Sequence, residues 1–75
     1  MDLDHEKIDN AVLALLLLGT SGNRAWKGYD ADVLDRLHQK GLIDDPRTKS
    51  LSIVFTGEGL SQAKKLLEEL FGRER

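Results

Sequence analysis

The chain has 75 residues and a mass of 8.4 kDa, which is enough for one small domain spanning residues 1–75. It contains no cysteine, which excludes disulfides, thiolate metal sites and a cysteine nucleophile and favours a cytoplasmic protein. Eleven basic and thirteen acidic residues give a formal net charge of -2, which argues against a dominant role in binding nucleic acid or anionic membranes.

Residues 5–18 are predicted to form the first helix, which Asp4 caps and Gly19 ends. Its apolar arc consists of Ile8, Ala11, Val12, Leu15, Leu16 and Leu18. The far side of its first half consists of Glu6, Asp9 and Asn10. Leu13 and Leu17 make the second half apolar nearly all round, so that half must be buried on two sides. The apolar run is shorter than a membrane span and follows acidic residues, so we expect neither a spanning helix nor a signal peptide.

Residues 19–29 break the periodicity with glycines and small polar residues, and we predict a loop with at most one helical turn at residues 24–27. Asp30 then caps a second helix of about eleven residues. It ends at Gly41, in the left-handed position, with Lys40 at the negative end of the helix dipole. Its inner arc consists of Ala31, Val33, Leu34, Leu37 and His38. Its predicted outer face consists of Asp32, Asp35, Arg36 and Gln39.

Residues 42–43 begin an extended segment, residues 44–49 hold the only proline and form a turn, and residues 51–55 alternate as a half-buried strand. Thr56 is expected to cap the last helix, which ends before Gly72. Its apolar face consists of Leu60, Ala63, Leu67, Leu70 and Phe71. The predicted fold class is therefore α+β, with three main helices and a short two-stranded β-hairpin before the last helix.

Two sets of residues resemble known families. The order of elements, residues 37–43 (Leu-His-Gln-Lys-Gly-Leu-Ile) and residues 55–60 (Phe-Thr-Gly-Glu-Gly-Leu) resemble the winged-helix domain of regulators of the MarR and PadR type, in a reduced form. Residues 23–30 (Asn-Arg-Ala-Trp-Lys-Gly-Tyr-Asp) and 34–43 (Leu-Asp-Arg-Leu-His-Gln-Lys-Gly-Leu-Ile) are similar to a family of short bacterial proteins of unknown function. The first resemblance implies DNA binding, whereas the second implies no activity.

If the winged-helix resemblance carries function, the second helix enters the major groove and reads bases through Arg36, Gln39 and Lys40. Phosphate contacts are then expected from Arg24, Lys27, Arg47 and Lys49. Residues 24–49 contain six basic and five acidic residues, a net charge of only +1, and Asp32 is placed to pair with Arg36 at (i, i+4). The sequence leaves two interpretations of this face, a DNA-reading surface and a solvated face with internal ion pairs, and favours the second.

Association between chains is a further hypothesis. Below about 70–80 residues a single core supplies only a few kcal/mol, and chains without disulfides or metals often gain stability by oligomerising. Leu13 and Leu17 on the back of the first helix, with Leu66 and Phe71 on the last, are candidates for a seam between two copies. The alternative is that Trp26 and its loop cover Leu13 and Leu17 within one chain.

The remaining patterns support no catalytic or cofactor chemistry. Trp26 and Tyr29 could stack on single-stranded nucleic acid, but core packing is the favoured role for them. His5 and His38 form no metal-binding pair, and the serines lack an accompanying base and acid. We therefore predict a non-catalytic interaction module without cofactor, metal or small-molecule substrate, which pairs with a second copy or another protein. The alternative is a DNA-binding protein of the winged-helix type.

Overall fold

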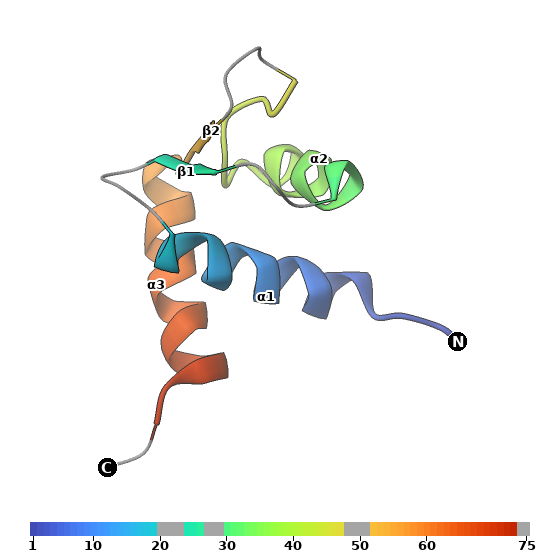
Figure 1. Cartoon of the computed structure of the whole chain (residues 1–75), viewed down its shortest axis with the longest axis vertical. Coiled ribbons are helices and arrows are strands. Elements are labelled where there is room, and N and C mark those ends of the chain that lie inside the picture. Colours follow the sequence, from blue (N-terminus) through green and yellow to red (C-terminus); the bar gives the residue numbers. More distant parts are fainter. Residues whose placement is uncertain (20–23, 27–29, 48–51, 74–75) are drawn as a thin grey trace.

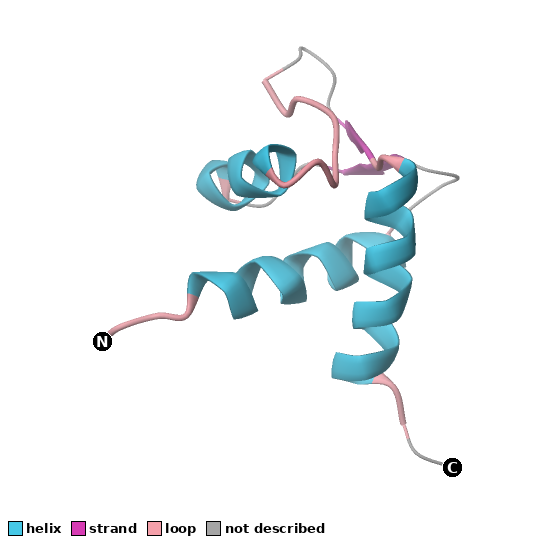
Figure 2. Ribbon diagram, turned by 180° about the vertical axis from the view of Figure 1, so that it is seen from behind, coloured by secondary structure: helices cyan, strands magenta, loops and turns pink. Residues whose placement is uncertain are grey.

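The computed structural model describes residues 1–19, 24–26, 30–47 and 52–73, and for residues 24–26 it describes the backbone alone. These residues form α1 (His5–Leu18), β1 (Arg24–Trp26), α2 (Ala31–Gln39), β2 (Ser52–Val54) and α3 (Gly57–Phe71), in that order (Figure 1). The three predicted helices and the α+β class are confirmed. α1 packs mainly against α3, while α2 and the two strands lie to one side of α1 (Figures 1 and 2).

All three predicted helix caps are present. The side chains of Asp4, Asp30 and Thr56 each accept a hydrogen bond from a backbone N–H in the first turn of the helix that follows. The donors are the amides of Lys7 (3.1 Å), Asp32 (3.4 Å) and Gly59 (2.9 Å), respectively. Short polar residues placed just before an apolar periodic segment therefore identify all three helix starts in this chain.

The end of α2 is a Schellman motif built on Gly41. Gly41 has a φ of 77°, which a glycine adopts without the steric cost that a Cβ brings. Its N–H donates to the carbonyl of His38 (2.9 Å), and the N–H of Leu42 donates to the carbonyl of Leu37 (3.1 Å). Both bonds use carbonyls that the end of a helix otherwise leaves without partners, so the predicted role of Gly41 is confirmed.

The end of α2 and the start of α3 are joined through Thr56. Its hydroxyl donates to the carbonyl of Gly41 (2.7 Å), and its N–H donates to the carbonyl of Leu42 (3.1 Å). Gly59, in the first turn of α3, lies so close to the Leu42 backbone that a Cβ at this position would collide with the carbonyl oxygen. The motif of residues 55–60 thus fixes the angle at which α3 leaves the rest of the domain.

The strands pair differently from the prediction. β1 and β2 are antiparallel, with Arg24 opposite Val54 and Trp26 opposite Ser52. The predicted hairpin is reduced to a single bridge between Ile43 and Phe55. The expectation of a loop or helical turn at residues 24–27 is wrong for residues 24–26, because three residues are too few to show a strand period and the partner strand lies far away in the sequence.

The core lies where α1, α2, α3 and β2 meet. Its buried apolar residues are Val12, Leu13, Ala14, Leu16, Val33, Leu34, Leu37, Leu42, Ile43, Ile53, Phe55, Ala63 and Leu66. α1 contacts α3 as well as α2 and β1. The prediction that its second half is buried on two sides holds for Leu13, Ala14 and Leu16. It is wrong for Leu15 and Leu18, which are exposed. Within the described part of the chain, no helix has both the length and the apolar character that crossing a membrane requires.

Candidate functional site

A buried carboxylate joins α1 to α2. The side chain of Asp9 on α1 is only 1% exposed, yet it accepts hydrogen bonds from Nε and Nη2 of Arg36, both at 2.8 Å. Nζ of Lys40 donates a third bond at 3.3 Å. The paired bonds from one guanidinium are the strong bidentate geometry of an arginine–carboxylate pair. Asp9 therefore holds α2 against α1 through Arg36 and Lys40, two cations one helical turn apart.

The pKa values follow from this geometry. The hydrogen bonds from Arg36 lower the pKa of Asp9 below its ordinary value, outweighing burial, which acts in the opposite direction. The same contact raises the pKa of Arg36. Asp9 is thus a carboxylate held in its charged form inside the domain.

Two predictions about these residues are wrong. Asp9 does not lie on a polar outer side, and Arg36 pairs with Asp9 rather than with Asp32. Asp9 precedes Leu13 by four residues and Leu16 by seven, so it continues the buried stripe of α1 toward the N-terminus. That spacing was visible in the sequence, but the partner on α2 was not, because it lies 27 residues away.

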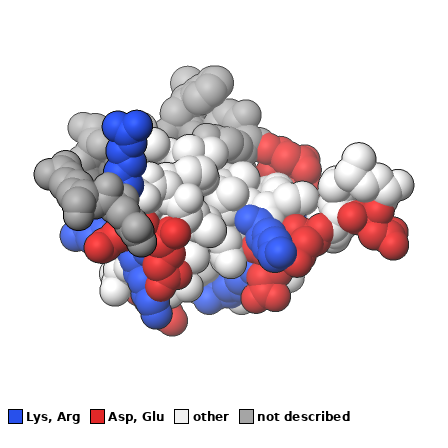
Figure 3. Space-filling model, turned by 90° about the horizontal axis from the view of Figure 1, so that it is seen from below, with Lys and Arg blue, Asp and Glu red and all other residues white. Residues whose placement is uncertain are grey.

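The other candidate DNA-contact residues are dispersed. Gln39 and Lys40 are exposed at the end of α2, and Arg47 pairs with Asp45 through Nε at 3.0 Å. The hydrogen bond from Arg47 lowers the pKa of Asp45. Lys27, Lys49 and the side chain of Arg24 lie outside the described residues, as do Tyr29 and the side chain of Trp26. On the face in Figure 3, the basic and acidic side chains of the described residues are interspersed.

Metal-ligating side chains do not gather in the described part of the chain. No group of three or more His, Asp or Glu residues there could hold an ion. His38, at the border of the inner arc of α2, instead lies with Nδ1 3.0 Å from the carbonyl oxygen of Ile43. This contact ties the end of α2 to the extended segment that follows.

The predicted seam residues divide into two groups. Leu13 is fully buried and Leu66 is nearly so, which means that both belong to the core and cannot line a surface. Leu17 is half-buried and Phe71 is 51% exposed, so these two do reach the surface. Leu13 is buried because α1 has neighbours on two sides, and the side of the helix that carries Leu13 faces one of them.

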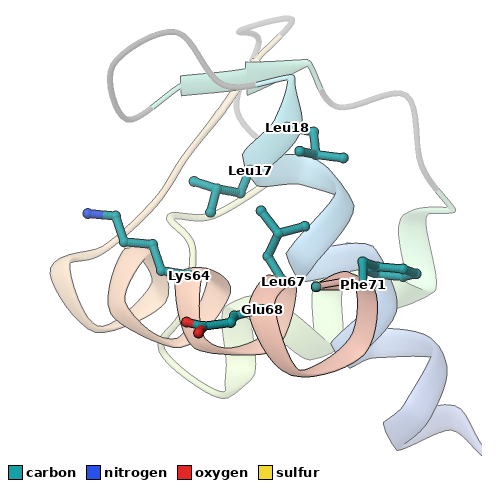
Figure 4. A pocket seen from close by; sticks show the side chains of 7 residues that line it. Leu17, Leu18, Lys64, Leu67, Glu68 and Phe71 are labelled. Carbon is teal, nitrogen blue, oxygen red and sulfur yellow. The ribbon is translucent and has the colours of Figure 1, made fainter. Parts of the chain in front are cut away.

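Large apolar side chains are exposed where the end of α1 meets the last turns of α3. Leu18 is 68% exposed, and Leu70 is 50% exposed. Between the two helices lies a hollow of about 420 Å³, which we call the α1–α3 hollow (Figure 4). It is lined by Leu17, Leu18, Lys64, Leu67, Glu68, Phe71 and Gly72. Sequence reasoning missed Leu18, Lys64, Leu67 and Glu68 as members of this surface. The spacing of three and four residues from Lys64 to Leu67 and Glu68 on α3 was a usable signal.

The hollow exists because α3 is longer than the part of it that packs against α1. The C-terminal half of α3 extends past α1 (Figures 1 and 2). Leu67 and Phe71, four residues apart, therefore face Leu17 and Leu18 on one side and solvent on the other (Figure 4). No other described element of the chain covers them.

The fold and these two features define a small α+β domain with an internal ionic contact between helices and an exposed apolar hollow. The chain belongs to a family described as a domain of unknown function (DUF6429), whose model matches residues 4–73. It is similar to "Uncharacterized protein y4hR" of Sinorhizobium fredii (strain NBRC 101917 / NGR234), with 53% identity over 74 residues that cover 97% of this chain and 100% of the relative. No solved structure matches the chain. The predicted resemblance to short bacterial proteins of unknown function agrees with both matches.

Proposed function

We propose that this domain is a non-catalytic, cytoplasmic interaction module that forms a homodimer through the α1–α3 hollow. The observation that carries the proposal is the exposure of Leu18 and Phe71, which both line the hollow. Scattered apolar residues are normal on a protein surface, whereas a contiguous apolar patch with polar residues at its edge is typical of an interaction site.

The position of the hollow supports a second protein chain as the occupant. The end of α3 projects beyond α1 (Figure 1), and it carries part of the hollow's wall. Its apolar side chains are therefore within reach of another chain.

The composition of the hollow favours a second copy of the same chain over a strongly charged partner. Its wall is mainly leucine and phenylalanine, with one basic residue, Lys64, and one acidic residue, Glu68. A two-fold dimer uses the same patch on both chains, so the patch must be complementary to itself. An apolar centre with one charge of each sign meets that requirement.

The proposal is tested by sedimentation equilibrium at loading concentrations from about 10 µM to about 1 mM, which span association free energies of roughly -7 to -4 kcal/mol. Leu18→Lys and Phe71→Lys each remove one apolar side chain from both copies, so the two-fold interface loses two. We expect each to raise the dimer Kd at least about 30-fold, or about 2 kcal/mol. Gln62→Lys is the matched control, because Gln62 is exposed on α3 but does not line the hollow.

Far-UV circular dichroism confirms that each variant remains folded. A wild type that sediments as a monomer across this range would contradict the proposal. So would a dimer that Leu18→Lys and Phe71→Lys weaken no more than Gln62→Lys does.

DNA binding of the winged-helix type is the second candidate, and the exposed Gln39 and Lys40 at the end of α2 are what favours it. It ranks lower because Arg36, Lys40 and Arg47, three of its expected contacts, already have carboxylate partners. Binding of a random duplex is measured by fluorescence anisotropy at about 20 mM and about 200 mM salt, since phosphate contacts weaken steeply over this range. Binding that Lys40→Ala weakens and salt abolishes would place DNA above self-association.

A further inference from the structure

The two charged residues of the α1–α3 hollow lie one helical turn apart on α3. Lys64 and Glu68 are both exposed, and Figure 4 shows them beside Leu67 at the edge of the apolar wall. Among the described residues, neither side chain has an ion-pair partner. The described part of the chain thus brings a cation and an anion to the hollow and pairs neither of them.

The last turn of α3 is acidic, and the first basic residue after it, Arg73, lies beyond the end of the helix. The last turn carries Glu68 and Glu69 and no basic residue. The C-terminus of a helix is its negative end, so acidic side chains there are destabilising and a nearby cation is stabilising. Lys64 precedes Glu68 by four residues, which is the weaker orientation for an ion pair within one helix. A cation supplied from outside the chain would relieve both effects.

Resting on the proposed homodimer, we propose that the two copies of α3 pack antiparallel about a two-fold axis that passes between Lys64 and Glu68, so that Lys64 of each copy pairs with Glu68 of the other. A rotation of 180° about such an axis places Lys64 of each copy opposite Glu68 of the other. A two-fold interface therefore contains this ion pair twice. Leu67 then lies close to this axis and, with Leu17 and Leu18, forms the apolar centre of the interface, while Phe71 lies about 7.5 Å along the helix from the axis. The ion pairs determine which orientation the dimer adopts, since complementary charges act mainly on specificity.

Charge reversal tests this pairing. Lys64→Glu or Glu68→Lys alone places like charges opposite each other at both ends of the interface, and we expect each to raise the dimer Kd about tenfold at low salt. Combining Lys64→Glu with Glu68→Lys restores opposite charges across the axis, and we expect a Kd within about threefold of the wild type. The effect of either single reversal should shrink at about 500 mM salt.

The chain offers a matched control. Lys65 and Glu69 have the same spacing on α3 and are exposed, but neither lines the hollow. Reversing Lys65 and Glu69, singly and together, should leave the Kd unchanged. All variants are compared by sedimentation equilibrium, with circular dichroism as the measure of folding.

The outcomes separate this pairing from the proposed function. A monomeric wild type would overturn both. A dimer that Leu18→Lys weakens, but in which the Lys64 and Glu68 double reversal is as weak as the single reversals, would overturn the antiparallel pairing alone. Single reversals without effect at low salt would overturn it as well.

Discussion

Replacing Asp9 with asparagine is the most informative change to the fold. The carboxamide keeps the size of the side chain and one acceptor oxygen but removes the charge and places an N–H donor against the guanidinium of Arg36. Breaking a buried ion pair costs about 3–5 kcal/mol when the remaining charge stays buried. Here the side chains of Arg36 and Lys40 are 31% and 40% exposed and can turn toward water. The expected loss is therefore smaller, about 2 kcal/mol.

A loss of about 2 kcal/mol is a large share of the free energy of unfolding of this domain. A domain of 75 residues has an unfolding free energy of about 4–11 kcal/mol. A decrease of about 2 kcal/mol corresponds to a Tm lower by roughly 8–16 °C in a domain of this size. Thermal and urea unfolding followed by circular dichroism measure it, and Asp45→Asn is the control because the Asp45 to Arg47 pair lies at the surface. We expect no measurable change in Tm from Asp45→Asn.

The pH dependence of the Asp9 variant gives an independent check. The pKa of Asp9 in the folded chain lies below its ordinary value of 3.8. A group with a lowered folded-state pKa stabilises the fold above its unfolded pKa, and this stabilisation disappears as the pH falls through the folded value. The difference in stability between wild type and Asp9→Asn should therefore be constant near neutral pH and shrink below pH 3.8. An equal Tm at pH 7, or a difference that persists unchanged to pH 2, would refute the reasoning.

Three further changes test the joint between α2 and α3 by urea unfolding. Gly41→Ala forces a Cβ into a φ of 77° and should cost about 1 kcal/mol, whereas a cost near zero would contradict the left-handed geometry. Thr56→Ala removes the cap of α3 and should cost about 1 kcal/mol, and Thr56→Ser, which keeps the hydroxyl, should recover most of it. Gly59→Ala pushes a methyl group into the Leu42 backbone and should cost more than Gly41→Ala does, so the reverse order would contradict the close packing at this joint.

The sequence predicts those parts of the fold that depend on neighbouring residues. The caps Asp4, Asp30 and Thr56 and the end of α2 at Gly41 all act over four or five residues, so their signals are contained in short stretches of sequence. Strand pairing and the Asp9 to Arg36 contact depend on how distant segments meet. β1 has only three residues, and its partner becomes known only when α2 is placed across α1.

Only part of the candidate interaction surface can be predicted from the sequence, because the rest depends on how distant segments meet. Periodicity correctly put Leu17 and Phe71 at the surface, because they flank the stripes that make the core. It could not show that Leu13 faces a second neighbour of α1 or that α3 extends past α1. Exposure of Leu18 depends on where α1 ends relative to α3, which is a property of the assembled fold.

Isotope-filtered NMR shows whether two copies of the chain meet at the α1–α3 hollow. A mixed sample of ¹³C-labelled and unlabelled chains reports contacts between copies alone. We predict intermolecular NOEs between the methyl groups of Leu17, Leu18 and Leu67 and the ring of Phe71. Intermolecular NOEs that arise from α2 instead, or none at a concentration of about 1 mM, where even an association of about -4 kcal/mol is detectable, would contradict dimerisation through this hollow.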